Sequence, residues 1–515
     1  MDEPVKKPRS GFHPVVFPTS AILIGSVVLA SLVATESVGD MFGYVQDTIV
    51  KRVGWLYVLA MTGFVGFAVW LLFSRHGDIR LGDDDSRPEF STPTWFAMLF
   101  SAGMGIGLLF FSVAEPITHY TSAPGVEGGT IESARQAMGL TFFHWCLHPW
   151  AVYAIVGLAL AYFSFRRKLP LSVRSMLHPL FGDRVHGRLG DVVDVLAVVS
   201  TLFGVATSLG LGATQVNAGL SYVMGVEIGT GAQVTIIAVV TAAATVSVVS
   251  GLDRGVKILS EANMVLAALL LLFVFLAGHT GFLLDSFVQN IGTYLQRLPE
   301  NSFWTATFDR RPPHPQQTWL AGNTIFYWAW WIAWAPFVGM FIARISRGRT
   351  IREFVGGVLL GPTVAGMVWL TVFGDSALYE ELFGTGGIAA AVTEDTSTAI
   401  FVLLERFPLA PVTMVACTIC VVLFFVTSSD SASLVIDTIA SGGATNPPVW
   451  QRVFWAVLEG VVAATLLLGG GLEALQTAAI TTALPFCIVL IVACWALARS
   501  LRDDAPGRAG RFDSK

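Results

Sequence analysis

The stretch NTIFYWAWWIAW, residues 323–334, is unusually dense in indole rings. On a helix, Trp330 and Trp334 share one face while Trp331 points about 100° away from Trp330, so the rings surround the helix. Packing against lipid explains this poorly, because each indole N–H needs a hydrogen-bond partner. The arrangement suits a cation that donates no hydrogen bond: each aromatic face contributes about 0.5 to 2 kcal/mol to binding a quaternary ammonium group.

A second aromatic cluster occupies FFHWCLHPWAVY, residues 142–153. Trp145, Trp150 and Tyr153 fall within one broad helical face, and Pro149 removes a backbone donor beside them. An aromatic belt at the membrane interface is the alternative, but the cluster continues into the apolar run AVYAIVGLALAYF, whereas belts lie near headgroups. The sequence therefore favours one cavity shared by these rings.

Two histidines in this cluster, His144 and His148, are four residues apart. This spacing places both side chains on one face of a helix, where they could bind a metal ion. No carboxylate or cysteine lies beside them at metal-ligand spacing, so we interpret both as helix-packing residues.

Three glycines interrupt the run SAGMGIGLLFF, residues 101–111. Gly103 and Gly107 could form a small-residue packing face. Alternatively, Gly103, Gly105 and Gly107 mark a place where a membrane helix unwinds beside a ligand.

The elements that would hold these residues are membrane helices, since 54% of the 515 residues are hydrophobic and only 13% are charged. We predict twelve spans. Their approximate centres are Gly25, Gly63, Ile106, Val156, Ser208, Val240, Leu270, Ala333, Ala365, Val421, Ala464 and Leu490.

Basic residues orient this bundle, because Lys and Arg concentrate in cytoplasmic loops. Most of the 31 basic residues fall on one side if both termini are cytoplasmic, including those of residues 166–168 and 344–352. The net charge of −5 does not indicate a nucleic-acid partner.

The spans lack the residues of an enzyme. Their ionisable groups, including Glu115, Asp430 and Glu459, have no nucleophile, metal set or matched base at catalytic spacing. Asp430 must face protein, a partner or water.

The five cysteines all fall in predicted spans and are interpreted as packing residues. A membrane sensor that binds without transporting remains an alternative.

Several runs resemble the betaine/carnitine/choline transporter family, and most closely its sodium-coupled glycine betaine members. They are FYWAWWIAWAPFVGMFIARISRGRTIREF (326–354), AGMGIGLLFF, AEP (114–116), HWCLHPWAVYA and FFVTSSDSAS (424–433). The resemblance implies an all-α polytopic membrane protein of twelve helices with two inverted five-helix repeats, a LeuT-like fold.

The same resemblance divides the chain. It implies a short cytoplasmic N-terminus (1–14), two peripheral helices and a cytoplasmic loop (15–93), a first five-helix repeat (94–285), an extracytoplasmic amphipathic connector (286–318), a second repeat (319–500) and a short cytoplasmic C-terminus (501–515).

Substrate-binding residues follow by matching motif. Trp145, Trp150, Tyr153 and Trp331 look like an aromatic box for a trimethylammonium group, with Trp330 and Trp334 along the pathway. The segment containing Gly103, Met104, Gly105 and Gly107 looks like an unwound helix that meets a substrate carboxylate.

Gly107 also bears on substrate choice. Members that take net cations such as choline tend to carry aspartate there, so glycine favours a zwitterion, with glycine betaine first. Carnitine, ectoine and dimethylsulfoniopropionate stay open as alternatives, as does choline.

For sodium, the resemblance implies side-chain oxygens from Thr427 and Ser428 and backbone oxygens from Ser101, Met104 and Phe424. Hydrogen bonding of these hydroxyls to the preceding helical turn is an equal alternative from the residues alone. A second sodium site would use Thr201 and Phe337. Val205, where a second threonine could sit, leaves the two-ion stoichiometry open, and proton-coupled or exchange transport is the alternative to sodium coupling.

The sequence thus predicts a secondary active importer in the inner membrane that uses alternating access coupled to sodium. No cofactor is expected beyond this coupling ion. Membrane lipid is an expected partner, and a homotrimer is implied by family analogy.

Overall fold

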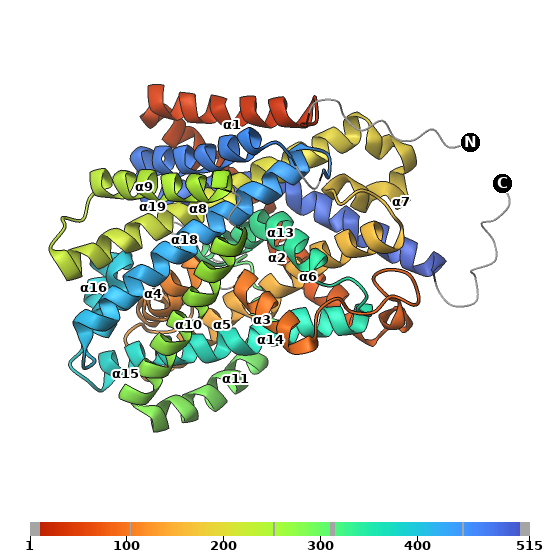
Figure 1. Ribbon diagram of the computed structural model, residues 1–515. Helices are drawn as coiled ribbons and strands as arrows, with labels where there is room; N and C mark the ends of the chain where they lie inside the picture. Colours follow the sequence, from red (N-terminus) through yellow and green to blue (C-terminus); the bar gives the residue numbers. More distant parts are fainter. Residues whose placement is uncertain (1–10, 104, 251–252, 309–314, 445–446, 505–515) are drawn as a thin grey trace, which may run out of the picture.

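The structure is a computed structural model that describes residues 11–504, apart from 104, 251–252, 309–314 and 445–446 (Figure 1). Within these residues all regular elements are helical, and one isolated bridge joins Arg80 to Thr350. The α-helices are α1 (Val16–Val33), α2 (Thr35–Phe73), α3 (Thr92–Gly103), α4 (Ile106–Ser122), α5 (Ile131–Trp145), α6 (Leu147–Ala161), α7 (His178–Phe181), α8 (Arg188–Met224), α9 (Thr230–Ser250), α10 (Asp253–Ala277), α11 (Thr280–Phe303), α12 (Pro315–Leu320), α13 (Phe326–Arg344), α14 (Ile351–Leu370), α15 (Ser376–Leu382), α16 (Ile388–Glu394), α17 (Ala399–Leu404), α18 (Ala410–Ala440) and α19 (Val449–Asp503). The predicted all-α class is confirmed.

Ten helical stretches in the described part of the chain are long and apolar enough to cross a membrane. The last of them, α19, has 55 residues and would be about 80 Å long if straight, against a hydrocarbon thickness of about 30 Å. Its backbone leaves helical geometry at Gly470 and at Gly471, whose φ of 61° favours glycine. A bend there divides α19 into two helical pieces.

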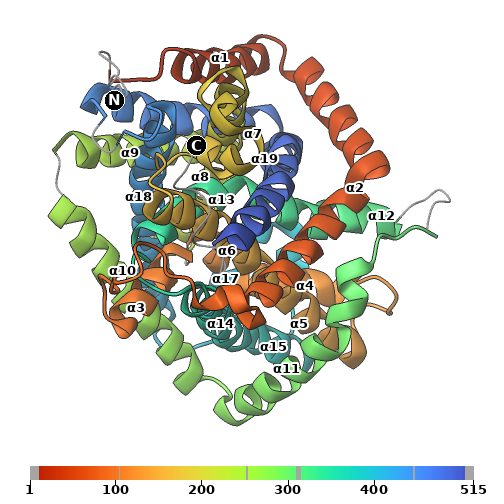
Figure 2. The same cartoon turned by 90° about the vertical axis from the view of Figure 1, so that its right-hand side faces the viewer.

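The helices differ sharply in how much of their surface is covered. The most hydrophobic windows of Ile131–Arg166, Gln316–Arg344 and Arg188–Met224 are 94%, 89% and 83% buried, whereas those of α1, α9 and α10 are each 22% buried. Figure 2 shows α6 and α13 near the middle of the bundle, with α1, α2, α10 and α11 around the outside. Apolar side chains that face outward on α1, α9 and α10 must therefore meet lipid.

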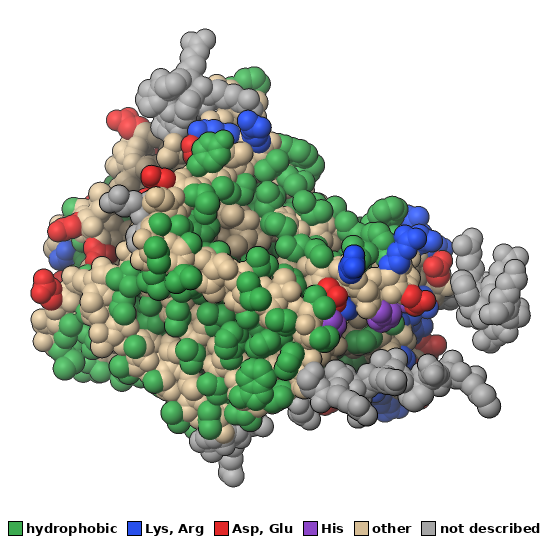
Figure 3. All heavy atoms as spheres, turned by 90° about the horizontal axis from the view of Figure 1, so that it is seen from above, with side chains coloured by type: hydrophobic (Ala, Val, Ile, Leu, Met, Phe, Trp, Pro, Cys, Tyr) green, Lys and Arg blue, Asp and Glu red, His purple; other side chains and the backbone are tan. Residues whose placement is uncertain are grey.

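Loops that the sequence predicts to be cytoplasmic meet at one end of the bundle. Leu81 after α2 pairs through its backbone with Gly348 and Arg349 between α13 and α14. Arg166 after α6 forms ion pairs with Asp84 at 2.7 Å and with Asp504 at 2.9 Å. Figure 3 shows charged side chains toward two opposite ends of one face and hydrophobic ones across the area between them.

Candidate functional site

One membrane-length stretch, Ile131–Arg166, supplies the first group of aromatic rings, and it is broken into two short helices. The sequence predicts one span centred at Val156, but α5 ends at Trp145 and α6 begins at Leu147. Cys146 between them has non-helical angles, φ −97° and ψ −112°. Pro149 explains the break, because it has no N–H to donate to the carbonyl of Trp145 four residues earlier. Trp145 thus ends one helix while Trp150 and Tyr153 belong to the next.

These rings meet those of α13 around one cavity of about 40 Å³, which has room for a few water molecules. Its lining residues are Gly105, Gly107, Leu108, Trp145, Pro149, Trp150, Tyr153, Ser208, Trp330, Trp331, Trp334 and Val338. The structure therefore brings together all six predicted aromatic residues and two of the predicted glycines, from α4, α5, α6 and α13 and from the residue before α4.

The box residues contact one another mainly edge to face. The ring centroids of Trp145 and Trp331 lie 4.8 Å apart at 73°, those of Tyr153 and Trp331 6.4 Å apart at 80°, and those of Trp150 and Tyr153 5.6 Å apart at 83°. Trp330 stacks on Trp331 at 4.8 Å and 15°. Rings set at steep angles to one another can offer several π faces to one cation.

Hydrogen bonds hold four of the indoles by their N–H groups. Nε1 of Trp334 donates to the Gly204 carbonyl of α8 at 2.9 Å, and Nε1 of Trp330 donates to Ser208 Oγ at 3.1 Å. Nε1 of Trp331 donates to the His144 carbonyl at 2.9 Å.

Nε1 of Trp145 donates to Glu115 Oε2 at 2.5 Å. Each of these four N–H groups thus has a protein acceptor, and a ligand without donors or acceptors can occupy the space between the ring faces.

The glycine-rich segment lies against the box. Helix α3 ends at Gly103, and Gly105 is extended (φ −151°, ψ −171°) before α4 begins at Ile106. Met104 lies outside the described residues. A Cβ on Gly107 would lie 2.4 Å from Trp330 Cη2 and 3.2 Å from Trp145 Cη2. A glycine here allows the α4 backbone to approach the rings, and α4 directs its positive N-terminal end toward them.

Of the predicted sodium residues, Phe424, Thr427 and Ser428 all lie on α18. Thr427 Oγ1 donates to the Leu423 carbonyl at 2.9 Å, the back-bonded geometry of the alternative interpretation. Its oxygen lone pairs remain compatible with an ion, so both interpretations stand. The Ser101 side chain and Met104 lie outside the described part, and the five-residue set stays a prediction.

The residues of the predicted second sodium site lie on neighbouring helices, Thr201 on α8 and Phe337 on α13. Thr201 Oγ1 is buried with no hydrogen-bond partner among the described residues. Val205, one turn further along α8, is also completely buried. A buried unpaired hydroxyl is consistent with an ion ligand, whereas Val205 supplies no oxygen.

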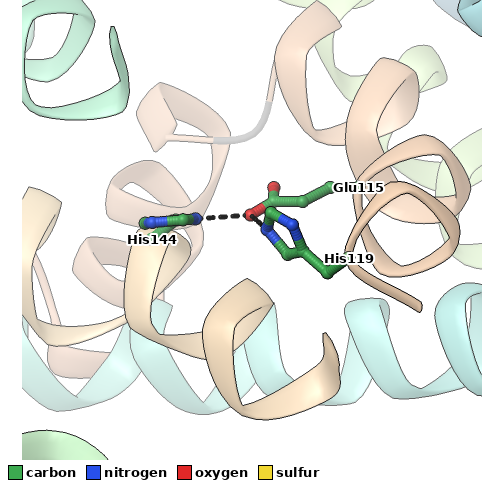
Figure 4. Close-up of side chains that lie close together, drawn as sticks. All are labelled: Glu115, His119 and His144. Carbon is green, nitrogen blue, oxygen red and sulfur yellow. Dashed lines mark hydrogen bonds and ion pairs between the residues drawn. The ribbon is translucent and has the colours of Figure 1, made fainter. Parts of the chain in front are cut away.

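A buried polar cluster beside the box escaped the sequence analysis. Figure 4 shows His144 and His119 directed at the carboxylate of Glu115, with distances of 2.6 Å and 3.1 Å to Oε1. The spacing of Glu115 and His119 by four residues was the available signal, but nothing local connects them to His144. His148, in contrast, stacks on Trp328 at 4.9 Å, as predicted for a packing histidine.

The three residues Glu115, His119 and His144 resemble a metal-ligand set. However, the 2.6 Å separation of His144 Nδ1 from Glu115 Oε1 is a direct hydrogen bond. Two ligands of one ion would instead turn their lone pairs toward it. Hydrogen bonding therefore accounts for this cluster.

Long apolar helices packed around a buried aromatic cavity indicate a multi-pass membrane protein. Residues 15–506 match the betaine/carnitine/choline family transporters. The chain belongs to this family and is a transporter, not an enzyme.

Its relatives include an uncharacterized transporter of Mycobacterium tuberculosis, 53% identical over 96% of this chain and 83% of that protein. Glycine betaine transporter 1 of Vibrio parahaemolyticus is 46% identical over 96% of this chain and 94% of its own length. A glycine betaine/proline/choline transporter of the same organism is 44% identical over 96% and 90%.

Proposed function

We propose that this transporter imports glycine betaine by alternating access, coupled to sodium. The aromatic cavity carries the proposal: the rings of Trp145, Trp150, Tyr153 and Trp331 line one space, and the indole N–H groups of Trp145 and Trp331 are already bonded to protein acceptors. A trimethylammonium group is bound by the faces of aromatic rings and has no use for hydrogen-bond donors. Relatives that are named glycine betaine transporters support the same substrate.

The carboxylate of the substrate is assigned to the segment Gly103–Gly107. The extended conformation of Gly105 and the start of α4 at Ile106 support this assignment, because the first N–H groups of a helix have no intrahelical acceptor. The aromatic box and the N-terminus of α4 together match both charges of a zwitterion. Since the cavity of about 40 Å³ is smaller than a betaine molecule, we expect the rings to separate when the substrate enters.

For the fold, we propose twelve spans with two inverted five-helix repeats. The α3–α4 pair would form one broken span, and the bend at Gly470 and Gly471 would divide α19 into two. The meeting of basic loops at one end supports cytoplasmic termini in an inner-membrane protein. A homotrimer is proposed from the family alone.

Sodium is assigned to the oxygens of Ser101, Met104, Phe424, Thr427 and Ser428. The packing of α4 against α18 supports this set, because it brings the broken span near the hydroxyl-bearing helix. Thr201 and Phe337 are kept as a second candidate position, at which Val205 supplies no further hydroxyl, so one or two sodium ions per cycle are compatible with the proposal. Proton-driven uptake is the alternative coupling.

Choline is the runner-up substrate, because one relative is named as a choline transporter as well. Gly107 itself places no carboxylate in the cavity, so a net cation finds no direct charge partner at that position. Carnitine, ectoine and dimethylsulfoniopropionate remain further alternatives.

Uptake of radiolabelled glycine betaine into proteoliposomes tests this function. An inward sodium gradient should drive accumulation, and unlabelled choline should compete more weakly than glycine betaine. Uptake driven by a pH gradient and indifferent to sodium would contradict the coupling. Binding without accumulation under either gradient would instead indicate a sensor.

A further inference from the structure

Glu115 of α4 is a fully enclosed acidic residue, with 3% of its surface exposed. Its carboxylate touches the box directly, because Oε2 accepts the indole N–H of Trp145 at 2.5 Å. Oε1 faces His144 Nδ1 at 2.6 Å and His119 Nε2 at 3.1 Å (Figure 4). A buried carboxylate thus stands directly behind one wall of the proposed trimethylammonium box.

The hydrogen-bond partners of the two histidines indicate their protonation. His119 Nδ1 is buried and has no partner among the described residues, so a proton there would be left without an acceptor. A neutral His119 with its proton on Nε2 avoids this and donates to Glu115. His144 Nε2 pairs with Thr324 Oγ1 at 2.9 Å, and the hydroxyl can donate to it, which leaves Nδ1–H to donate to Glu115.

Glu115 therefore receives donors from Trp145, His119 and His144, and the Tyr327 hydroxyl also hydrogen-bonds to its side chain. A carboxylate accepts at both oxygens, whereas a protonated carboxyl would bring its own proton into an already donor-filled shell. Within the described part of the chain, the ion-pair contacts of Glu115 are with these two histidines alone, and no Lys or Arg joins them. With both histidines neutral, the cluster carries one uncompensated negative charge.

We propose that Glu115 is a positioning and specificity residue for the box: its carboxylate fixes the ring of Trp145 and supplies the negative charge that favours a quaternary ammonium ion. A hydrogen bond to an ionised acceptor is about twice as strong as a neutral one, so the Trp145 ring is held firmly. The charge also attracts the cation through a medium of low dielectric constant. This inference rests on the function proposed above.

The charge has different consequences for different ligands. Tetramethylammonium carries only the positive group and gains the full attraction. Glycine betaine also carries a carboxylate, whose repulsion offsets part of that gain. Removal of the charge should therefore weaken tetramethylammonium more than glycine betaine, a difference that a general loss of packing would not produce.

Glu115→Gln tests this, because the amide keeps the size of the side chain and can still accept from Trp145. Binding of tetramethylammonium and of glycine betaine to the purified transporter would be measured by titration calorimetry at fixed sodium. We expect a loss of at least tenfold for tetramethylammonium, about 1.4 kcal/mol, and a loss of threefold or less for glycine betaine.

Asp375→Asn is the matched control, since Asp375 is a similarly buried carboxyl that bonds Asn290 and does not line the cavity. It should change both affinities by less than twofold. Glu115→Asp serves if the glutamine variant does not fold: it keeps the charge but is too short to reach Trp145, so both ligands should weaken while their affinity ratio stays as in the wild type.

Equal weakening of both ligands in Glu115→Gln, or no weakening, would overturn the inference, as would an affinity ratio that changes in Glu115→Asp. These outcomes leave the proposed function intact. If the wild-type protein binds neither ligand, both this inference and the proposed function are wrong.

Discussion

Replacement of Gly107 by alanine should disturb the aromatic box through a single methyl group. The new Cβ would lie 2.4 Å from Trp330 Cη2, a separation that carbon atoms do not tolerate. Trp330 cannot yield freely, because it is 1% exposed, donates to Ser208 and stacks on Trp331. A methyl group forced into a packed site costs about 1 to 3 kcal/mol.

That cost sets the size of the effect. If Trp330 moves and carries Trp331 with it, the affinity for glycine betaine should fall by about 5- to 150-fold. Gly366→Ala is the matched control. Gly366 is a buried residue of α14 that does not line the cavity, and a Cβ there meets nothing within 4 Å. Its affinity should stay within about twofold of the wild type.

Competition binding with labelled glycine betaine would measure both variants, with thermal stability recorded beside it. Equal affinities for the two alanine variants would refute the reasoning, because they would mean that Trp330 moves aside without cost. A fall in stability without a fall in affinity would place the cost in the fold instead of the box.

Three further predictions follow from single contacts. Thr427→Val should raise the half-saturating sodium concentration for uptake by tenfold or more, and an unchanged sodium dependence would remove Thr427 from the ion site. Trp331→Phe keeps a ring but loses the bond to the His144 carbonyl, so substrate affinity should fall about two- to tenfold in the same competition assay; an unchanged affinity would mean that this bond does not hold the ring. Asp194→Asn removes the buried charge that pairs with Arg174 Nε at 2.6 Å. Loss of this partner should lower the free energy of unfolding by about 3 kcal/mol, the low end for a broken buried ion pair, because Asp191 still lies 3.0 Å from the Arg174 guanidinium. The unfolding temperature should fall, and an unchanged unfolding temperature would contradict this.

The sequence by itself determined the class of the protein and predicted the rings that line the cavity. Apolar runs of membrane length are local patterns, and so is the spacing that places Trp330 and Trp334 on one face. Both indoles indeed donate to the same Gly204 carbonyl. Pro149 is also visible in the sequence and indicates a missing helical hydrogen bond. The position of the resulting break, at Cys146, depends on backbone geometry that the sequence does not specify.

Only the tertiary structure decided which polar residues contact those rings. His144 lies 29 residues from Glu115 and 187 residues from Trp331, yet it contacts both. Such partners are chosen by the packing of α4, α5 and α13, and helical periodicity carries no information about contacts between helices. The sequence therefore predicted a box without a nearby charge, whereas the packed helices place the Glu115 carboxylate against the indole N–H of Trp145.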